Sequence, residues 1–94
     1  MASFIMAMSI NPTAKKHHGD LSVKISESLE CFDANGAKVQ NIYATMGRYD
    51  ILAVFQAADQ TVAFKVASDI TRQGILDTET WPVIPFEDFS QMIG

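Results

Sequence analysis

The sequence is poor in several residue types, and each shortage excludes a class of protein. It has one cysteine, three prolines and five glycines in 94 residues. The lone Cys31 excludes an internal disulfide and a zinc site built on several cysteines, and it is typical of a reducing compartment. Because 48% of the residues are hydrophobic, a disordered or low-complexity chain is also excluded.

Positive charge is scarce as well. The chain has 7 Lys and Arg residues against 11 Asp and Glu residues, a net charge of −4. Contacts to nucleic-acid phosphates or anionic lipids need basic residues, so we expect neither a nucleic-acid nor a membrane partner. The apolar residues 2–10 have no basic residue before Lys15, unlike a signal peptide. No apolar run approaches the ~20 residues of a membrane span, and we expect a cytoplasmic protein.

Hydrophobic periodicity predicts one domain over residues 1–94, in which strands and helices alternate. The elements expected, in chain order, are strand 3–10, helix 21–34, strands 38–46 and 49–57, helix 60–73, strand 75–84 and a short helix after Pro85. We expect a loop over residues 11–20, because Pro12 and Gly19 interrupt regular secondary structure there. Asp20 and Asp59 are the expected N-caps of the two long helices, which should end at Gly36 and Gly74.

This order predicts an α+β, ferredoxin-like βαββαβ sandwich, with an antiparallel four-stranded sheet and two helices on one face. The first and third strands are the most apolar and should be central. The fourth strand contains Pro82, which cannot donate to a ladder, so it should be an edge strand. Both central strands are apolar on both sides, so a second copy is expected to cover the face without helices. We therefore predict a homodimer or a higher homo-oligomer.

Residues 43–54, YATMGRYDILAV, resemble the hairpin signature of the GYD domain family, which is named for Gly-x-Tyr-Asp. The resemblance is strong from about Gly36 to Phe89 and weaker in residues 11–19. It implies a dimeric α/β barrel. That fold group includes cofactor-free monooxygenases, small isomerases, haem-binding proteins and ligand-sensing domains, so the resemblance leaves the chemistry open.

The signature residues Gly47, Arg48, Tyr49 and Asp50 have two interpretations. In the structural one, Gly47 adopts a positive φ in a tight turn, Asp50 accepts hydrogen bonds from turn amides, and Tyr49 begins the next strand. In the functional one, Asp50 and Arg48 lie at the mouth of a pocket as a base and an anion anchor.

His17 and His18 follow two lysines in the only local basic cluster of the chain. They belong either to a solvated loop or to a contact with an anion or substrate near a helix N-terminus. No third ligand stands at a recognised spacing, so we predict no metal site. We predict no cofactor either; haem remains an alternative, because histidine is its usual axial ligand.

Apolar and aromatic residues supply the remaining candidates. Phe4, Met6, Met8 and Phe55 are expected in the core, in the dimer interface or in the lining of an apolar pocket. Tyr43 would be the polar contact of such a pocket, and Trp81 is a further candidate for ligand binding.

Three functions fit these residues. The first is a non-enzymatic module that binds a small, partly apolar ligand or a protein partner. The second is a cofactor-free monooxygenase or isomerase of a small aromatic or keto acid, with His17, His18, Tyr43 or Asp50 transferring protons. The third is a structural subunit of a larger assembly, which would use Phe64 and Val23. We favour the first function, which is not enzymatic, because the sequence has no strong catalytic constellation.

Overall fold

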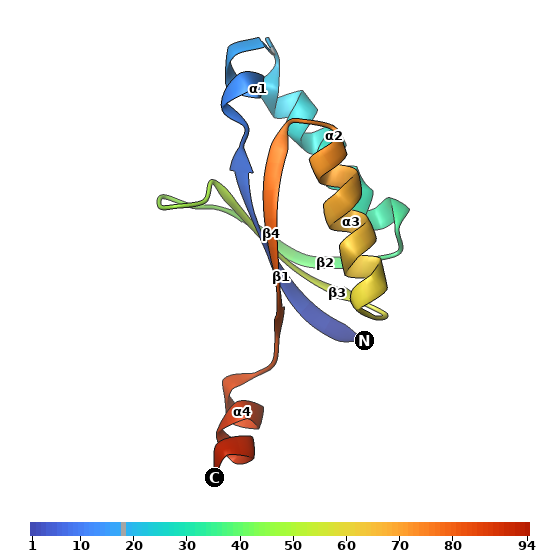
Figure 1. Cartoon of the computed structure of the whole chain (residues 1–94), viewed down its shortest axis with the longest axis vertical. Coiled ribbons are helices and arrows are strands. Elements are labelled where there is room, and N and C mark those ends of the chain that lie inside the picture. Colours follow the sequence, from blue (N-terminus) through green and yellow to red (C-terminus); the bar gives the residue numbers. More distant parts are fainter. Residues whose placement is uncertain (18) are drawn as a thin grey trace.

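The computed structural model of the chain describes residues 1–17 and 19–94 (Figure 1). Its elements are β1 (Ala2–Ile10), α1 (Pro12–His17), α2 (Leu21–Ala34), β2 (Lys38–Ala44), β3 (Ile51–Ala57), α3 (Gln60–Arg72), β4 (Leu76–Val83) and α4 (Phe86–Ile93). The strands form one antiparallel sheet in the order β2-β3-β1-β4. This confirms the predicted fold, with β1 and β3 central and the proline-containing β4 at an edge.

The two long helices begin and end where their capping residues predict. Asp20 and Asp59 accept hydrogen bonds from the backbone N–H groups of Val23 and Val62, at 3.3 and 3.1 Å. Gly36 and Gly74 follow the helix ends with φ of +76° at both, a conformation that costs glycine little.

Two local predictions were wrong. Residues 12–17 form helix α1 because Asn11 caps it: Asn11 Oδ1 accepts from the N–H of Thr13 at 2.8 Å, and Pro12 opens the first turn. The tight turn at Gly47 is absent, since β2 ends at Ala44 and β3 begins at Ile51. Gly47 is not among the described glycines with positive φ.

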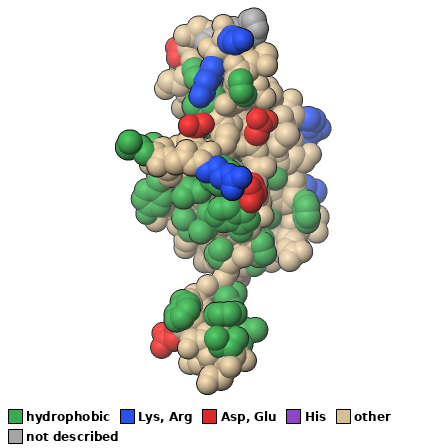
Figure 2. All heavy atoms as spheres, turned by 60° about the vertical axis from the view of Figure 1, so that its left-hand side comes forward, with side chains coloured by type: hydrophobic (Ala, Val, Ile, Leu, Met, Phe, Trp, Pro, Cys, Tyr) green, Lys and Arg blue, Asp and Glu red, His purple; other side chains and the backbone are tan. Residues whose placement is uncertain are grey.

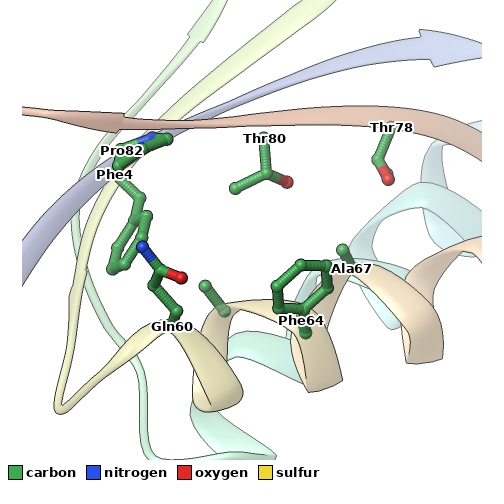
Figure 3. A pocket seen from close by; sticks show the side chains of 8 residues that line it. Phe4, Gln60, Phe64, Ala67, Thr78, Thr80 and Pro82 are labelled. Atoms are coloured by element: carbon green, nitrogen blue, oxygen red, sulfur yellow. The ribbon is translucent and has the colours of Figure 1, made fainter.

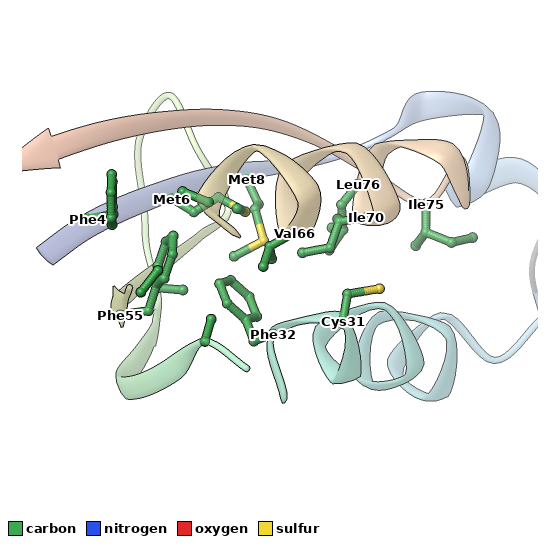
Figure 4. Packing of buried hydrophobic residues seen from close by; sticks show 14 of the residues in the cluster. Phe4, Met6, Met8, Cys31, Phe32, Phe55, Val66, Ile70, Ile75 and Leu76 are labelled. Atoms are coloured by element: carbon green, nitrogen blue, oxygen red, sulfur yellow. The ribbon is translucent and has the colours of Figure 1, made fainter. Parts of the chain in front are cut away.

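The core lies between the sheet and the helices α2 and α3, which cover one face (Figures 1 and 4). The strands contribute alternate residues to it, and the helices contribute their apolar stripes. Phe4, Met6, Met8, Phe32, Phe55, Val66 and Ile70 are all buried there. The four candidates from β1 and β3 therefore face the helices and lie in the core, which was one of the positions expected for them.

The opposite face of the sheet, called the outer face below, has no helix over it (Figure 1). The strand registers place alternate residues on it, among them Ile5, Ala7, Leu52, Val54, Tyr43, Glu79, Trp81 and Val83. Apolar side chains gather over this face in Figure 2. Ala7 is fully buried, the four aliphatic side chains larger than Ala7 are half-buried, and both aromatic side chains are exposed.

The last helix, α4, follows β4 and projects beyond the end of the sheet (Figure 1). None of its residues is buried. In the described part of the chain, no helix combines the length and the apolar character that crossing a membrane requires.

Candidate functional site

A cleft of about 400 Å³ opens between α3 and β4, on the helix side of the sheet (Figure 3). Its walls come from β1, α3 and β4. The lining residues are Phe4, Gln60, Ala63, Phe64, Ala67, Thr78, Thr80 and Pro82.

The cleft exists because β4 presents short side chains where the register calls for core residues. Thr78, Thr80 and Pro82 stand opposite Met8, Met6 and Phe4 of β1, so they face the helices. On the other side, α3 offers two small residues, Ala63 and Ala67, to the same space. Nothing large fills the gap between strand and helix, and a volume of this size is within the range of small-molecule pockets.

Three neutral polar groups line the cleft. Thr80 Oγ1 is buried and has no hydrogen-bond partner, and its side chain points from β4 toward α3 (Figure 3). Thr78 Oγ1 lies 3.2 Å from Thr71 Oγ1, and Gln60 contributes an amide. None of the described residues that line the cleft is charged. A buried hydroxyl without a partner is unfavourable, so the cleft suits a molecule that hydrogen-bonds Thr80.

A second arrangement lies on the outer face, and we call it the Glu79 cluster: Tyr49, Glu79 and Trp81, with Arg48 nearby. The carboxylate of Glu79 accepts hydrogen bonds from Tyr49 Oη and, at 2.8 Å, from Trp81 Nε1. The Tyr49 and Trp81 rings meet edge to face, with centroids 6.0 Å apart. Tyr49, the tyrosine of the signature, is thereby hydrogen-bonded to Glu79 of the edge strand β4.

Hydrogen bonding shifts the pKa values of this cluster in opposite directions. The hydrogen bond to Glu79 raises the pKa of Tyr49, because it favours the protonated phenol. The hydrogen bonds from Tyr49 and Trp81, together with the charge of Arg48, lower the pKa of Glu79.

Tyr49→Phe is expected to raise the pKa of Glu79 toward its usual value, measured by NMR titration of the Glu79 carboxyl carbon. The stabilisation that accompanies the lowered Glu79 pKa is fully present above the unfolded-state pKa, and it is lost as the pH falls through the folded-state pKa. The stabilisation that accompanies the raised Tyr49 pKa is fully present below the unfolded-state pKa of about 10, and it is lost as the pH rises through the higher folded-state pKa. In urea unfolding, the Tyr49→Phe variant should therefore lack the loss of stability at alkaline pH that ionisation of Tyr49 causes in the wild type. Tyr43→Phe, the same change at the other tyrosine, is the control, and an unchanged Glu79 pKa in Tyr49→Phe would contradict the assignment.

Asp50 anchors the connection 45–50 through contacts with β1, rather than through the turn amides expected from the sequence. Its Oδ2 accepts from the N–H of Ile10 at 2.8 Å, and its own N–H donates to the Met8 carbonyl at 2.9 Å. Its carbonyl also accepts from the N–H of Thr45 at 2.9 Å. Asp50 thus fixes both ends of the connection 45–50 to the end of β1, which holds Arg48 and Tyr49 at the outer face.

The structure brings only some of the sequence candidates together. Tyr49 and Trp81 meet on the outer face, and Arg48 is near enough for its charge to lower the pKa of Glu79. Tyr43 lies on the same face but on β2, the opposite edge strand. Of the ligand-binding and interface candidates whose side chains are described, Phe4 alone lines the cleft, next to Phe64, which was expected in an assembly surface. His18 and the side chain of His17 lie outside the described residues, so a ligand contact by the two histidines stays a prediction.

Sequence reasoning missed Gln60, Thr78, Thr80 and Glu79. A signal for the two threonines exists: the helix-facing positions of β4 read Leu76, Thr78, Thr80 and Pro82, polar or small where a core strand is usually apolar. Glu79 has no comparable signal, because its partner Tyr49 is distant in sequence.

Other chemistry-bearing groups are few in residues 1–17 and 19–94. No group of three or more His, Cys, Asp and Glu residues there could hold a metal ion. Cys31 is buried, accepts a hydrogen bond from Gln73 Nε2 at 3.3 Å, and has a pKa raised mainly by burial. A thiol with a raised pKa is a poor nucleophile.

Solved structures of the same fold include regulatory proteins. A feast or famine regulatory protein from Mycobacterium tuberculosis, solved as a complex with L-methionine, is 13% identical with a TM-score of 0.64, over 90% of this chain and 51% of its own. A protein described as FFRP-DM1 is 15% identical with a TM-score of 0.63, over 89% of this chain and 100% of its own. A hypothetical protein from Pyrococcus horikoshii is 15% identical with a TM-score of 0.58, over 90% of this chain and 92% of its own. The chain thus spans about half the length of the first of these proteins.

Among curated proteins, no sequence matches this chain. The family model of the GYD domain, in contrast, matches residues 4–93, nearly the whole chain. The match includes the signature residues that hold the connection 45–50 on the outer face. The chain belongs to the GYD domain family.

Proposed function

We propose that this protein is a homodimeric module, without enzymatic activity, that binds a small, partly apolar ligand in the cleft between α3 and β4. The observation that carries the proposal is the buried Thr80 hydroxyl, which has no hydrogen-bond partner although Thr80 lines the cleft. We place the module in the cytoplasm, in keeping with its single free thiol.

The cleft lining indicates the class of ligand. Phe4, Phe64 and the two alanines suit a ring or a branched alkyl group, and Thr80 and Gln60 suit a hydroxyl or carbonyl on it. The regulatory protein from M. tuberculosis was solved with L-methionine, so this fold is compatible with small-ligand binding. A free amino acid carries two charges, however, and no described residue of the cleft lining would compensate them. We therefore propose a neutral ligand.

The same lining favours binding over catalysis. The alternative of a monooxygenase or isomerase needs titratable groups that converge in the pocket. None of the described lining residues titrates, and the Glu79 cluster lies on the other face of the sheet. The alternative of a structural subunit rested on Phe64 and Val23. Phe64 forms part of the cleft wall instead.

Benzyl alcohol and benzoate test the proposal as a neutral and an anionic probe of similar size. In ¹H–¹⁵N and methyl NMR spectra, benzyl alcohol is expected to shift the signals of Thr78, Thr80, Ala63 and Ala67, and benzoate is expected to bind more weakly. Thr80→Val should weaken benzyl alcohol binding about two- to tenfold, the range for one hydrogen bond.

Thr13→Val is the matched control, since Thr13 is exposed on α1. It should leave binding unchanged. Shifts that lie away from the cleft, or equal affinity for both probes, would contradict the proposed site.

A further inference from the structure

Helix α4 carries an apolar side that nothing in the described part of the chain covers. The exposed fractions of Phe86, Phe89, Met92 and Ile93 are 79, 45, 75 and 69%. These residues recur at helical spacing and form one stripe, and Gln91 lies on the opposite side. An isolated helix shorter than about 12–15 residues is only marginally stable in water, so α4 needs a surface to pack against.

The position of α4 indicates where that surface is. The chain measures 51 × 28 × 17 Å, and α4 projects along its long axis beyond β4. It is displaced from the sheet away from α2 and α3, toward the side of the outer face (Figure 1). In Figure 2, apolar side chains of α4 and of the outer face are seen from the same side. A second molecule placed against the outer face would therefore also meet α4.

Area and charge favour a second copy of the same chain. With 150–250 Å² for an aromatic side chain, the stripe exposes roughly 500 Å² of apolar surface. A standard interface needs about 800 Å² from each partner, which the stripe and the outer face together can supply. The charged residues of α4 are Glu87 and Asp88, both acidic. Arg48, which is exposed and lowers the pKa of Glu79, puts a positive charge at the outer face of the copy that α4 would meet.

We propose that α4 is an arm exchanged between two copies: its apolar stripe packs at the margin of the second copy's outer face, and the second copy's α4 does the same in return. The two-fold symmetry of a closed dimer makes each contact occur twice. The inference rests on the homodimer of the proposed function, and it adds that the C-terminal helix of each chain belongs to the surface of the other.

The test compares Phe89→Asp with Gln91→Asp, which add the same charge to opposite sides of α4. Sedimentation equilibrium should give a dimer Kd raised at least tenfold by Phe89→Asp and changed less than twofold by Gln91→Asp. Both variants should fold like the wild type, because α4 buries no residue within its own chain. Their ¹⁵N NMR spectra check this.

A photo-crosslinking residue at position 89 tests the contact directly, in a mixture of isotope-labelled and unlabelled chains. Crosslinks between labelled and unlabelled chains support the exchange. If the wild type dimerises but Phe89→Asp does not weaken the dimer, or if crosslinks stay within one chain, the arm is refuted and the homodimer stands. A wild type that is monomeric at all concentrations refutes the homodimer and the arm together.

Discussion

Replacing Phe55 by alanine is expected to lower the free energy of unfolding by about 3–5 kcal/mol, the range for removing a buried aromatic side chain. Phe55 is fully buried at the centre of β3, where its ring stacks on Phe4 at a centroid distance of 5.4 Å and meets Phe32 edge to face at 4.9 Å. These contacts join β1, β3 and α2. Since domains of this size are stable by only about 5–15 kcal/mol, one truncation here removes a large part of the total.

Urea unfolding measures this loss as a lower transition midpoint at an unchanged slope. The control is Phe64→Ala, which makes the same change at a residue that is 74% exposed and should alter the free energy by no more than about 0.5 kcal/mol. All chains are compared at one protein concentration, because dimerisation makes apparent stability depend on it. Similar losses for the two variants would mean that the core is not centred on Phe55.

The sequence predicted those parts of the fold that depend on neighbouring residues. Asp20 and Asp59 mark the helix starts because a cap acts within three residues, and Gly36 and Gly74 mark their ends for the same reason. Pro82 predicted that β4 is an edge strand, because a residue without an N–H cannot donate to a neighbouring strand in any sheet. The predicted loop at residues 11–20 was wrong although Asn11 and Pro12 carry a helix-start signal of this kind.

The candidate site depended on pairings that the sequence does not reveal. The cleft forms only because β4 pairs with β1 in a register that sets Thr80 opposite Met6. Glu79 acquires its partner only when Asp50 fixes the connection 45–50 to the end of β1. Tyr49 was correctly singled out as a signature residue, but its hydrogen bond to a carboxylate 30 residues away follows from the strand order rather than from local spacing.

Replacing Val54 by aspartate is expected to convert the proposed dimer into a monomer. Val54 is half-buried on the outer face, where β3 pairs it with Ile5 of β1 and Asn41 of β2. A carboxylate there would lose its water in the interface without gaining a partner, a cost of at least about 2 kcal/mol. The dimer Kd should therefore rise roughly thirtyfold or more, as measured by light scattering after size-exclusion chromatography.

Val23→Asp makes the same change on α2, where Val23 is 48% exposed on the helix side, and should leave the dimer intact. Because β3 is central, Val54→Thr serves as a milder second variant, and the ¹⁵N spectrum of each monomer shows whether it is folded. The cleft lies on the opposite face of the sheet, so folded Val54→Asp monomers should bind benzyl alcohol as the wild type does. Loss of probe binding in a folded monomer would instead show that the cleft needs the second copy. A folded Val54→Asp chain that remains dimeric would place the interface elsewhere than on the outer face.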